Sequence, residues 1–187
     1  MPRLLDVKSR DRVVVEAAWR VIERGGLPAL SVRTLAAEAG LPPSSLRTTF
    51  PTQAQARRAA LLEALRQQER RIAAAADPRS MLLALLPLGP ASRTEGAVLL
   101  ALRTAAPGDP ELEALRQEAD EVVLRACEEA VQAQGGDDLL LVRLLHALVD
   151  GLALRLLHDQ DAEGEAARAV DRLLAVVAGA TAARAAR

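Results

Sequence analysis

The chain is poor in aromatic residues: it has one Trp, one Phe and no Tyr among its 187 residues. Strands favour aromatic and β-branched side chains, whereas the abundant Ala, Leu, Arg and Glu favour helices, so this composition predicts an all-α fold. The single cysteine, Cys127, excludes an internal disulfide. The two histidines, His146 and His158, do not have a metal-binding spacing such as H-E-x-x-H. We therefore expect neither a disulfide framework nor a zinc site.

Long apolar runs and catalytic motifs are also missing from the sequence. No run reaches the ~18 apolar residues of a membrane span, and the N-terminal residues lack the apolar core of a signal peptide. We therefore expect a soluble, cytoplasmic protein with no membrane partner. The sequence has no Gly-rich phosphate loop and no clustered acid–base groups, so we expect no cofactor and no enzymatic activity.

Charge is distributed unevenly along the chain, although the net charge is only −1. The first 58 residues carry ten basic and five acidic side chains, which gives this segment a charge of +5. The remainder carries 14 Arg and 20 acidic residues, a charge of −6. A basic N-terminal third on an acidic remainder indicates that the first part contacts a polyanion.

Apolar residues recur at helical spacing, with Gly and Pro at the interruptions. The predicted helices cover residues 9–24, 32–39, 43–50, 53–76, 81–86, 94–105, 111–134, 138–158 and 163–178. We expect the Ala- and Arg-rich residues after 178 to fray. The predicted domains are an N-terminal three-helix domain, residues 1–55, and a larger helical domain, residues 56–187.

Residues 31–50 have the pattern of a helix-turn-helix that reads DNA. Ser31 is a helix N-cap, Gly40 marks a tight turn, and Pro43 opens a second short helix whose free N–H groups suit a phosphate. That helix is predicted to present short polar side chains and one guanidinium to a major groove: Ser44, Ser45, Arg47, Thr48 and Thr49. The alternative is a plain helical hairpin with a solvated polar face, in which Ser31 is only a structural cap.

From Arg12 to Ala60 the sequence resembles the N-terminal domain of the TetR family of bacterial transcriptional regulators. The residues that carry this resemblance are Ala17-Ala18, Gly26, the segment Leu30–Leu41, Leu46, Phe50 and Pro51-Thr52. A looser similarity to the ligand-binding domains of that family covers Leu145–Leu154. The resemblance implies a homodimer that binds a palindromic DNA operator and responds to a small-molecule effector.

The family pattern assigns DNA contacts residue by residue. Arg33 matches a position that touches a base or phosphate, Ser31 matches a phosphate-contacting cap, and Ser45 matches a contact of the recognition helix. Three positions depart from the family pattern: Arg47 replaces a phosphate-binding Tyr, Thr49 replaces a His, and Gln53 replaces a Lys. Loss of that Lys predicts weaker salt-dependent binding, for which Arg47 compensates.

The segment 138–158 is apolar around most of its circumference, which predicts burial against both the protomer core and a partner chain. The predicted dimer interface consists of Leu141, Leu145, Leu148, Gly151, Leu152 and Leu156. The alternative is the central helix of a monomer. The predicted effector pocket consists of Leu83, Leu86, Val98, Leu102, Arg103, Val123 and His146, although inward leucines are more often core. The scarcity of aromatics argues against a stacking pocket for flat cations.

Together these patterns predict a DNA-binding transcriptional regulator, a ligand-responsive repressor that acts as a homodimer. Two other readings remain open at this point. One is a helical ligand-binding or interaction protein whose degenerate helix-turn-helix no longer binds DNA specifically. The other is an enzyme built on the helical body, which would need acid–base groups that converge in a cavity.

Overall fold

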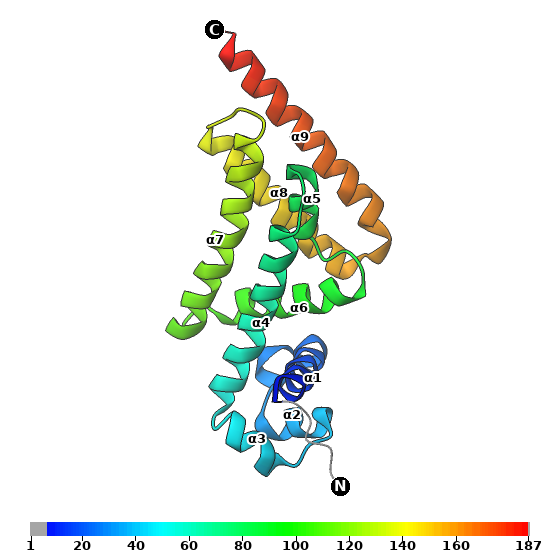
Figure 1. Cartoon of the computed structure of the whole chain (residues 1–187), viewed down its shortest axis with the longest axis vertical. Helices are drawn as coiled ribbons and strands as arrows, with labels where there is room; N and C mark the ends of the chain where they lie inside the picture. Colours follow the sequence, from blue (N-terminus) through cyan, green and yellow to red (C-terminus); the bar gives the residue numbers. More distant parts are fainter. Residues whose placement is uncertain (1–6, 187) are drawn as a thin grey trace. The chain divides into compact units, whose positions relative to one another are not determined.

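The computed structural model describes residues 7–186, with side chains described from residue 12 onward except at residues 160 and 185. Within this range all regular structure is helical, which confirms the all-α prediction (Figure 1). The helices are α1 (Val7–Ala29), α2 (Val32–Ala39), α3 (Pro43–Thr49), α4 (Gln53–Ala73), α5 (Pro78–Ala84), α6 (Pro90–Ala105), α7 (Pro110–Gln132), α8 (Leu139–His158) and α9 (Glu163–Ala185), with a 3-10 turn at Gln160–Ala162. None of the described helices is long and apolar enough to cross a membrane.

Most predicted helix boundaries lie within a few residues of the observed ones, and the larger differences have local causes. Helix α5 starts at Pro78 rather than at residue 81, because the Asp77 carboxylate caps it by accepting the Ser80 N–H at 2.8 Å. Helix α1 is interrupted at Gly26, where φ is 69°, and then resumes for a few residues. Helix α9 continues to Ala185, so the prediction that the chain frays after residue 178 is wrong for the described residues.

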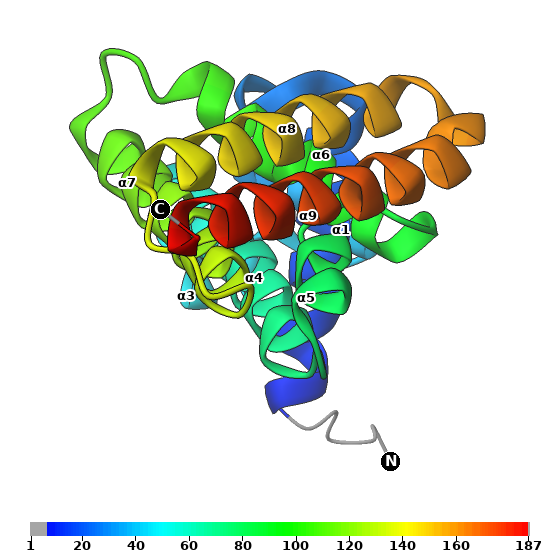
Figure 2. The same cartoon turned by 90° about the horizontal axis from the view of Figure 1, so that it is seen from above.

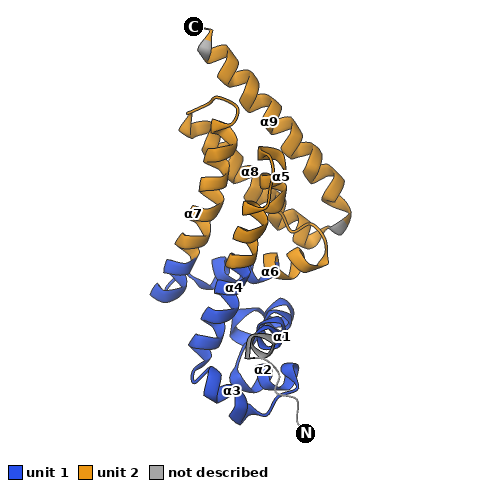
Figure 3. Ribbon diagram, in the orientation of Figure 1, with its two compact units in different colours: residues 1–65, 97–115 blue, residues 66–96, 116–187 orange. Residues whose placement is uncertain are grey.

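The chain folds into two compact units (Figure 3). Unit 1 comprises the described residues up to 65 together with 97–115, and unit 2 comprises residues 66–96 and those from 116 onward. The division therefore falls inside α4 rather than at the predicted boundary of residue 55. Its cause is that Ala56, Ala60, Leu61 and Ala64 of α4 are buried in the core of unit 1.

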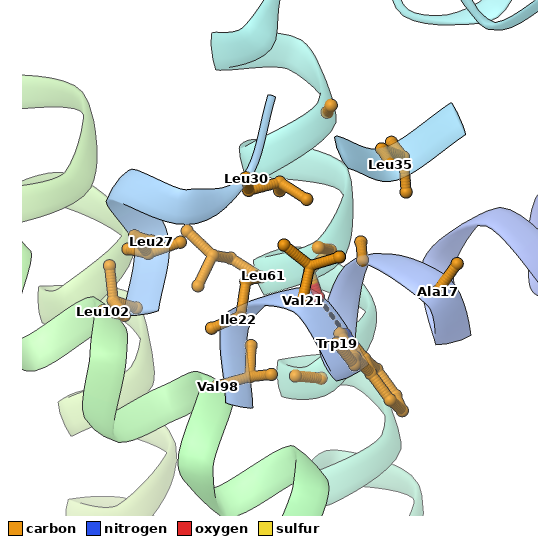
Figure 4. Close-up of a cluster of buried hydrophobic side chains, with 14 of the residues drawn as sticks. Ala17, Trp19, Val21, Ile22, Leu27, Leu30, Leu35, Leu61, Val98 and Leu102 are labelled. Carbon is orange, nitrogen blue, oxygen red and sulfur yellow. Dashed lines mark hydrogen bonds between the residues drawn. The ribbon is translucent and has the colours of Figure 1, made fainter. Parts of the chain in front are cut away.

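The core of unit 1 joins the N-terminal helices to parts of α4 and α6. Ile22 of α1 and Leu30, directly after α1, pack with Leu61 of α4 and Leu102 of α6 (Figure 4). The Trp19 indole N–H donates to the Ala60 carbonyl oxygen at 2.8 Å, so the one buried polar atom of this side chain has a partner (Figure 4). Helix α4 is thereby fixed to α1 by both apolar packing and a buried hydrogen bond.

The core of unit 2 is formed by α5, α7, α8 and α9. Helices α8 and α9 lie side by side (Figure 2). Two ion pairs also join the α5–α6 region to α9: the Arg79 guanidinium to Asp171 at 2.5 Å, and the Arg93 guanidinium to Glu163 at 2.5 Å. These exposed or half-exposed pairs contribute modestly to stability.

Cys127 lies in the core of unit 2 and has no exposed surface, as expected for a small buried hydrophobe. Burial raises the pKa of its thiol to about 12, and the negative charges of Asp150 and Glu128 add to this shift. Because the thiolate is the reactive form, this cysteine is protected both by its pKa and by the surrounding side chains.

We predict that Cys127 does not react with Ellman's reagent in the native protein at about pH 8, where a pKa of about 12 leaves about one thiolate in ten thousand. The same protein in concentrated guanidinium chloride should release one equivalent of thionitrobenzoate, which serves as the control. Rapid release of one equivalent from the folded protein would show that the thiol is accessible.

Candidate DNA-binding site

The start of α2 is built by a reciprocal pair of hydrogen bonds between Ser31 and Thr34. The Ser31 hydroxyl oxygen accepts the Thr34 backbone N–H at 3.1 Å, and the Thr34 hydroxyl oxygen accepts the Ser31 N–H at 2.8 Å. This is a capping box in which Thr takes the place of the more usual Glu or Gln. The predicted structural role of Ser31 is confirmed, and its phosphate contact stays a prediction.

The turn between α2 and α3 depends on Gly40. Its φ of 65° lies in the left-handed region, which side chains other than Gly rarely adopt. The following N–H of Leu41 donates to the Ala36 carbonyl oxygen at 3.0 Å and closes the end of α2. Pro43 then occupies the first turn of α3, where the missing N–H of proline is tolerated. Each end of the turn is therefore fixed by local backbone chemistry.

Helix α3 buries one side and exposes the rest. Leu46 is fully buried in the core of unit 1, and Phe50 is half-buried against it. Most of the predicted DNA contacts on this helix are exposed, whereas Ser45 is half-buried; the exposed residues are Pro43, Ser44, Arg47, Thr48 and Thr49. The structure thus places polar, hydrogen-bonding side chains on the outer surface of a helix that is anchored by its inner side.

Arg33 on α2 and Arg47 on α3 are both exposed, and neither forms an ion pair with any residue that the structure describes. Other arginines of unit 1 are paired: Arg12 contacts Glu16, Arg20 and Arg24 contact Glu38, and Arg58 contacts Glu111. The unneutralised positive charge on α2 and α3 is therefore carried by Arg33 and Arg47. An unpaired guanidinium beside a polar helix face suits a phosphate or a guanine edge.

Gln53 is placed differently from the other predicted contacts. It is half-buried, and its side-chain amide donates to the carbonyl oxygen of Leu30, directly before the cap of α2. The carboxamide is therefore engaged within the protein and positions the first turn of α4 beside the start of α2. No local sequence signal indicates this contact, because the two residues are 23 positions apart.

Glu38 is a positioning residue that the sequence analysis missed. One carboxylate oxygen accepts the Arg20 Nε at 2.7 Å, and the other contacts the Arg24 guanidinium, so α2 is clamped to α1. Hydrogen bonds from Arg24 and then Arg20 lower the pKa of the Glu38 carboxyl below its ordinary value. These partners lie 18 and 14 residues before Glu38, a separation that no helical spacing rule connects.

The residues predicted to line an effector pocket do not all belong to one unit. Val98 and Leu102 are buried in the core of unit 1, and Arg103 is a half-buried residue of the same unit. Leu86 and Val123 are buried in the core of unit 2, where Leu83 packs half-buried, and His146 Nε2 lies 3.6 Å from Asp150 Oδ2. Unit 2 instead has an open cleft of about 530 Å³ between α4 and the α5–α6 segment. That the seven predicted residues line an effector pocket stays a prediction.

The predicted dimer interface needs a correction at two positions. Leu145 and Leu156 have no exposed surface in the single chain, so they belong to the protomer core. Leu141, Leu148 and Leu152 are half-buried, and only Gly151 is exposed. The side of α8 that is exposed carries another stripe at helical spacing: Leu140, Leu144, Ala147, Gly151 and Leu154. Because the helix is apolar all round, its sequence did not show which side faces the core.

We predict that Glu38→Gln destabilises the protein near neutral pH, because it removes the charge that joins Arg20 and Arg24. A lowered folded pKa means that the carboxylate stabilises the fold above its ordinary pKa of 4.5, and this contribution disappears as the pH falls through the lower folded pKa. The free energies of unfolding of the wild-type and Glu38→Gln proteins, measured with urea, should therefore become equal at acidic pH. Glu118→Gln, an exposed change on α7, is the control, and a difference that persists at low pH would contradict the assignment.

Comparison with known proteins agrees with this geometry. The family model for the C-terminal region of BetI-type transcriptional repressors, a TetR class, matches residues 74–182. A 53-residue stretch is 43% identical to the HTH-type transcriptional regulator PksA of Bacillus subtilis, and it covers 28% of this chain but only 26% of that protein. A TetR-family structure from Streptomyces coelicolor is 30% identical and covers 88% of this chain and 97% of its own, with a TM-score of 0.69. The multidrug binding protein EbrR, solved with proflavin, is 29% identical. The match covers 88% of this chain and 99% of EbrR, with a TM-score of 0.57. The chain therefore belongs to the TetR family of transcriptional regulators.

Proposed function

We propose that the protein is a ligand-responsive repressor that binds a palindromic DNA operator as a homodimer. The observation that carries this proposal is the exposure of Arg33 on α2 and of Arg47, Ser44 and Thr48 on α3, where neither guanidinium forms an ion pair with a described residue. Local contacts fix the helix α2 at both ends: the Ser31 cap at its start and the left-handed Gly40 at its end. The ion pair of Glu38 with Arg20 also joins α2 to α1.

Recognition would use α3 as the helix that enters the major groove. Arg47 and the short hydroxyl side chains of α3 have the chemistry to reach base edges, and Arg33 suits a phosphate at the edge of the groove. One N–H of the Gln53 carboxamide donates to the Leu30 carbonyl oxygen, so a DNA contact by this side chain would have to use its other N–H or its amide oxygen.

The homodimer is supported by the exposed apolar stripe on α8. Leu140 is 65% exposed, Leu144 51% and Leu154 47%, which is unusual for leucines that recur on one helix face. A Cβ added at Gly151 would meet nothing within 4 Å, and the same holds for Gly179 on α9, so close approach of a second copy is sterically open at both glycines. A twofold axis through this surface would present two copies of α3 to half-sites about 34–36 Å apart.

A response to ligands is supported by the family and by the course of α4. That helix begins in unit 1, where it packs against α1, and its last turns, residues 66–73, belong to unit 2. EbrR, which shares the fold, was solved with proflavin bound. A ligand that favours one arrangement of α4 would shift the population of DNA-binding conformers, and the size of the shift would equal its differential affinity for the two arrangements.

We predict that Arg47→Ala weakens binding to a duplex selected from a random library by about 1–3 kcal/mol, or about 5- to 150-fold. If Arg47 holds a phosphate, the slope of log affinity against log salt should also fall by about 1. Fluorescence anisotropy across a salt series measures both. Arg125→Ala removes an exposed arginine of α7 in unit 2 and should leave both quantities unchanged. Failure to select any preferred sequence would favour the alternative of a degenerate helix-turn-helix.

We predict that Leu144→Glu converts the protein to a monomer at micromolar concentration, because a buried, unpaired carboxylate in the interface would cost about 3 kcal/mol or more. Analytical ultracentrifugation gives the oligomeric state, and circular dichroism checks that the chain remains folded. Val13→Glu, which adds a charge at an exposed apolar position of α1, should leave the state unchanged. A Leu144→Glu protein that remains dimeric would place the interface elsewhere.

A further inference from the structure

We propose that Thr48 determines specificity by reading one thymine in each half-site of the operator, through contact of its methyl group with the C5-methyl group of the base. The inference rests on the proposed entry of α3 into a major groove, and it adds the kind of base pair that this helix selects. Three observations carry it: the position of Thr48 on α3, the hydrogen bond of its hydroxyl group, and the short side chains beside it.

Thr48 lies on the side of α3 that is turned away from the core of unit 1. Leu46 is only 1% exposed and anchors the inner side of this helix. Thr48 follows Leu46 by two residues, which is a rotation of about 200° around the helix axis. Thr48 is exposed, and so is Ser44, one turn earlier on the same side. These two residues therefore lie nearest to the base edges when α3 enters a groove with its outer side first.

The hydroxyl group of Thr48 is engaged within its own helix, because it donates to the Ser44 carbonyl oxygen at 3.2 Å. A hydroxyl group has one proton to donate, so Thr48 retains no donor for the N7 and O6 acceptors of guanine. The hydrogen bond also fixes the χ1 rotamer of this β-branched side chain. Thr48 thus offers a base a methyl group and an oxygen that can only accept.

An A·T base pair complements these two groups. In the major groove thymine presents its C5-methyl group, and the paired adenine presents an amino group that donates a hydrogen bond. A G·C pair presents two acceptors on guanine and no methyl group on cytosine. Contact between two methyl groups removes apolar surface from water, and only thymine among the four bases of DNA supplies such a group.

The side chains around Thr48 allow the backbone of α3 to approach the bases closely. Pro43 and Ser44 are exposed and short. The longer Arg47 lies about 100° from Thr48 around the helix, toward the flank of the outer side. Thr48 and Thr49 are weak helix formers at the end of a helix of seven residues, so helix stability does not account for their presence there.

Replacement of thymine by deoxyuridine tests the contact, because it removes only the C5-methyl group and keeps the base pair. The full-length protein is titrated with a duplex selected from a random library, in which each thymine is replaced in turn together with its symmetry mate. Fluorescence anisotropy at constant salt gives the affinities. For one such pair we expect the affinity to fall about 4-fold per half-site and about 15-fold in all, the effect of one buried methyl group in each.

Two variants of Thr48 separate the methyl group from the hydroxyl group. Thr48→Ser should bind the thymine duplex as weakly as the wild type binds the deoxyuridine duplex, and deoxyuridine should weaken it no further. Thr48→Val keeps a methyl group, so it should bind the thymine duplex about as tightly as the wild type and retain the preference for thymine. Circular dichroism checks that both variants remain folded.

Thr104 of α6 supplies the matched control, because it is also exposed and its hydroxyl group also donates to a carbonyl oxygen of its own helix, that of Leu100, at 2.9 Å. Thr104→Ser and Thr104→Val should leave the affinities for both duplexes unchanged.

Sequence-specific binding that tolerates deoxyuridine at every thymine would overturn the inference and leave the repressor function intact. A Thr48→Ser protein that still prefers thymine, or a Thr48→Val protein that has lost the preference, would do the same, because the hydroxyl group would then be the reading group. Failure to select any preferred duplex would count against the repressor function itself and would overturn the inference with it.

Discussion

The DNA-reading face depends on how α2 is fixed at its two ends. At the start, Ser31 and Thr34 satisfy each other's backbone N–H and hydroxyl groups, and Gln53 holds the neighbouring Leu30 carbonyl. At the end, Gly40 adopts a left-handed conformation that lets the chain turn sharply into α3. Since α3 has only seven residues, it has little helical stability of its own and takes its orientation from this junction and from the burial of Leu46.

Helix α4 links this junction to the rest of the chain. Its first residue contacts Leu30, its next turns are buried in unit 1 and receive the Trp19 hydrogen bond, and its last turns line the cleft of unit 2. Helix α4 therefore contributes residues to both units, with its first residue beside the start of α2 and its last turns at the cleft of unit 2.

Much of the fold could be predicted from local sequence signals. The bounds of α2 were predicted correctly because Ser31 and Gly40 are short-range signals that act within a few residues of the helix ends. The contacts of Glu38 with Arg20 and of Gln53 with Leu30 were missed, because they join residues that are distant in sequence. The side of α8 that faces the core could not be predicted either, because leucines occur on both sides of the helix and the hydrophobic pattern does not distinguish them. The cleft was missed because ordinary helix-surface arginines do not reveal that one of them is fixed by a buried glutamate.

The central claim is that two symmetry-related copies of α3 occupy major grooves of one duplex. Hydroxyl-radical and methylation footprinting of a duplex selected from a random library tests this claim most directly. The account predicts two protected major-groove segments, related by twofold symmetry and separated by about 10–10.5 base pairs or a multiple of that spacing. A single protected segment, or uniform salt-sensitive binding with no sequence preference, would contradict it.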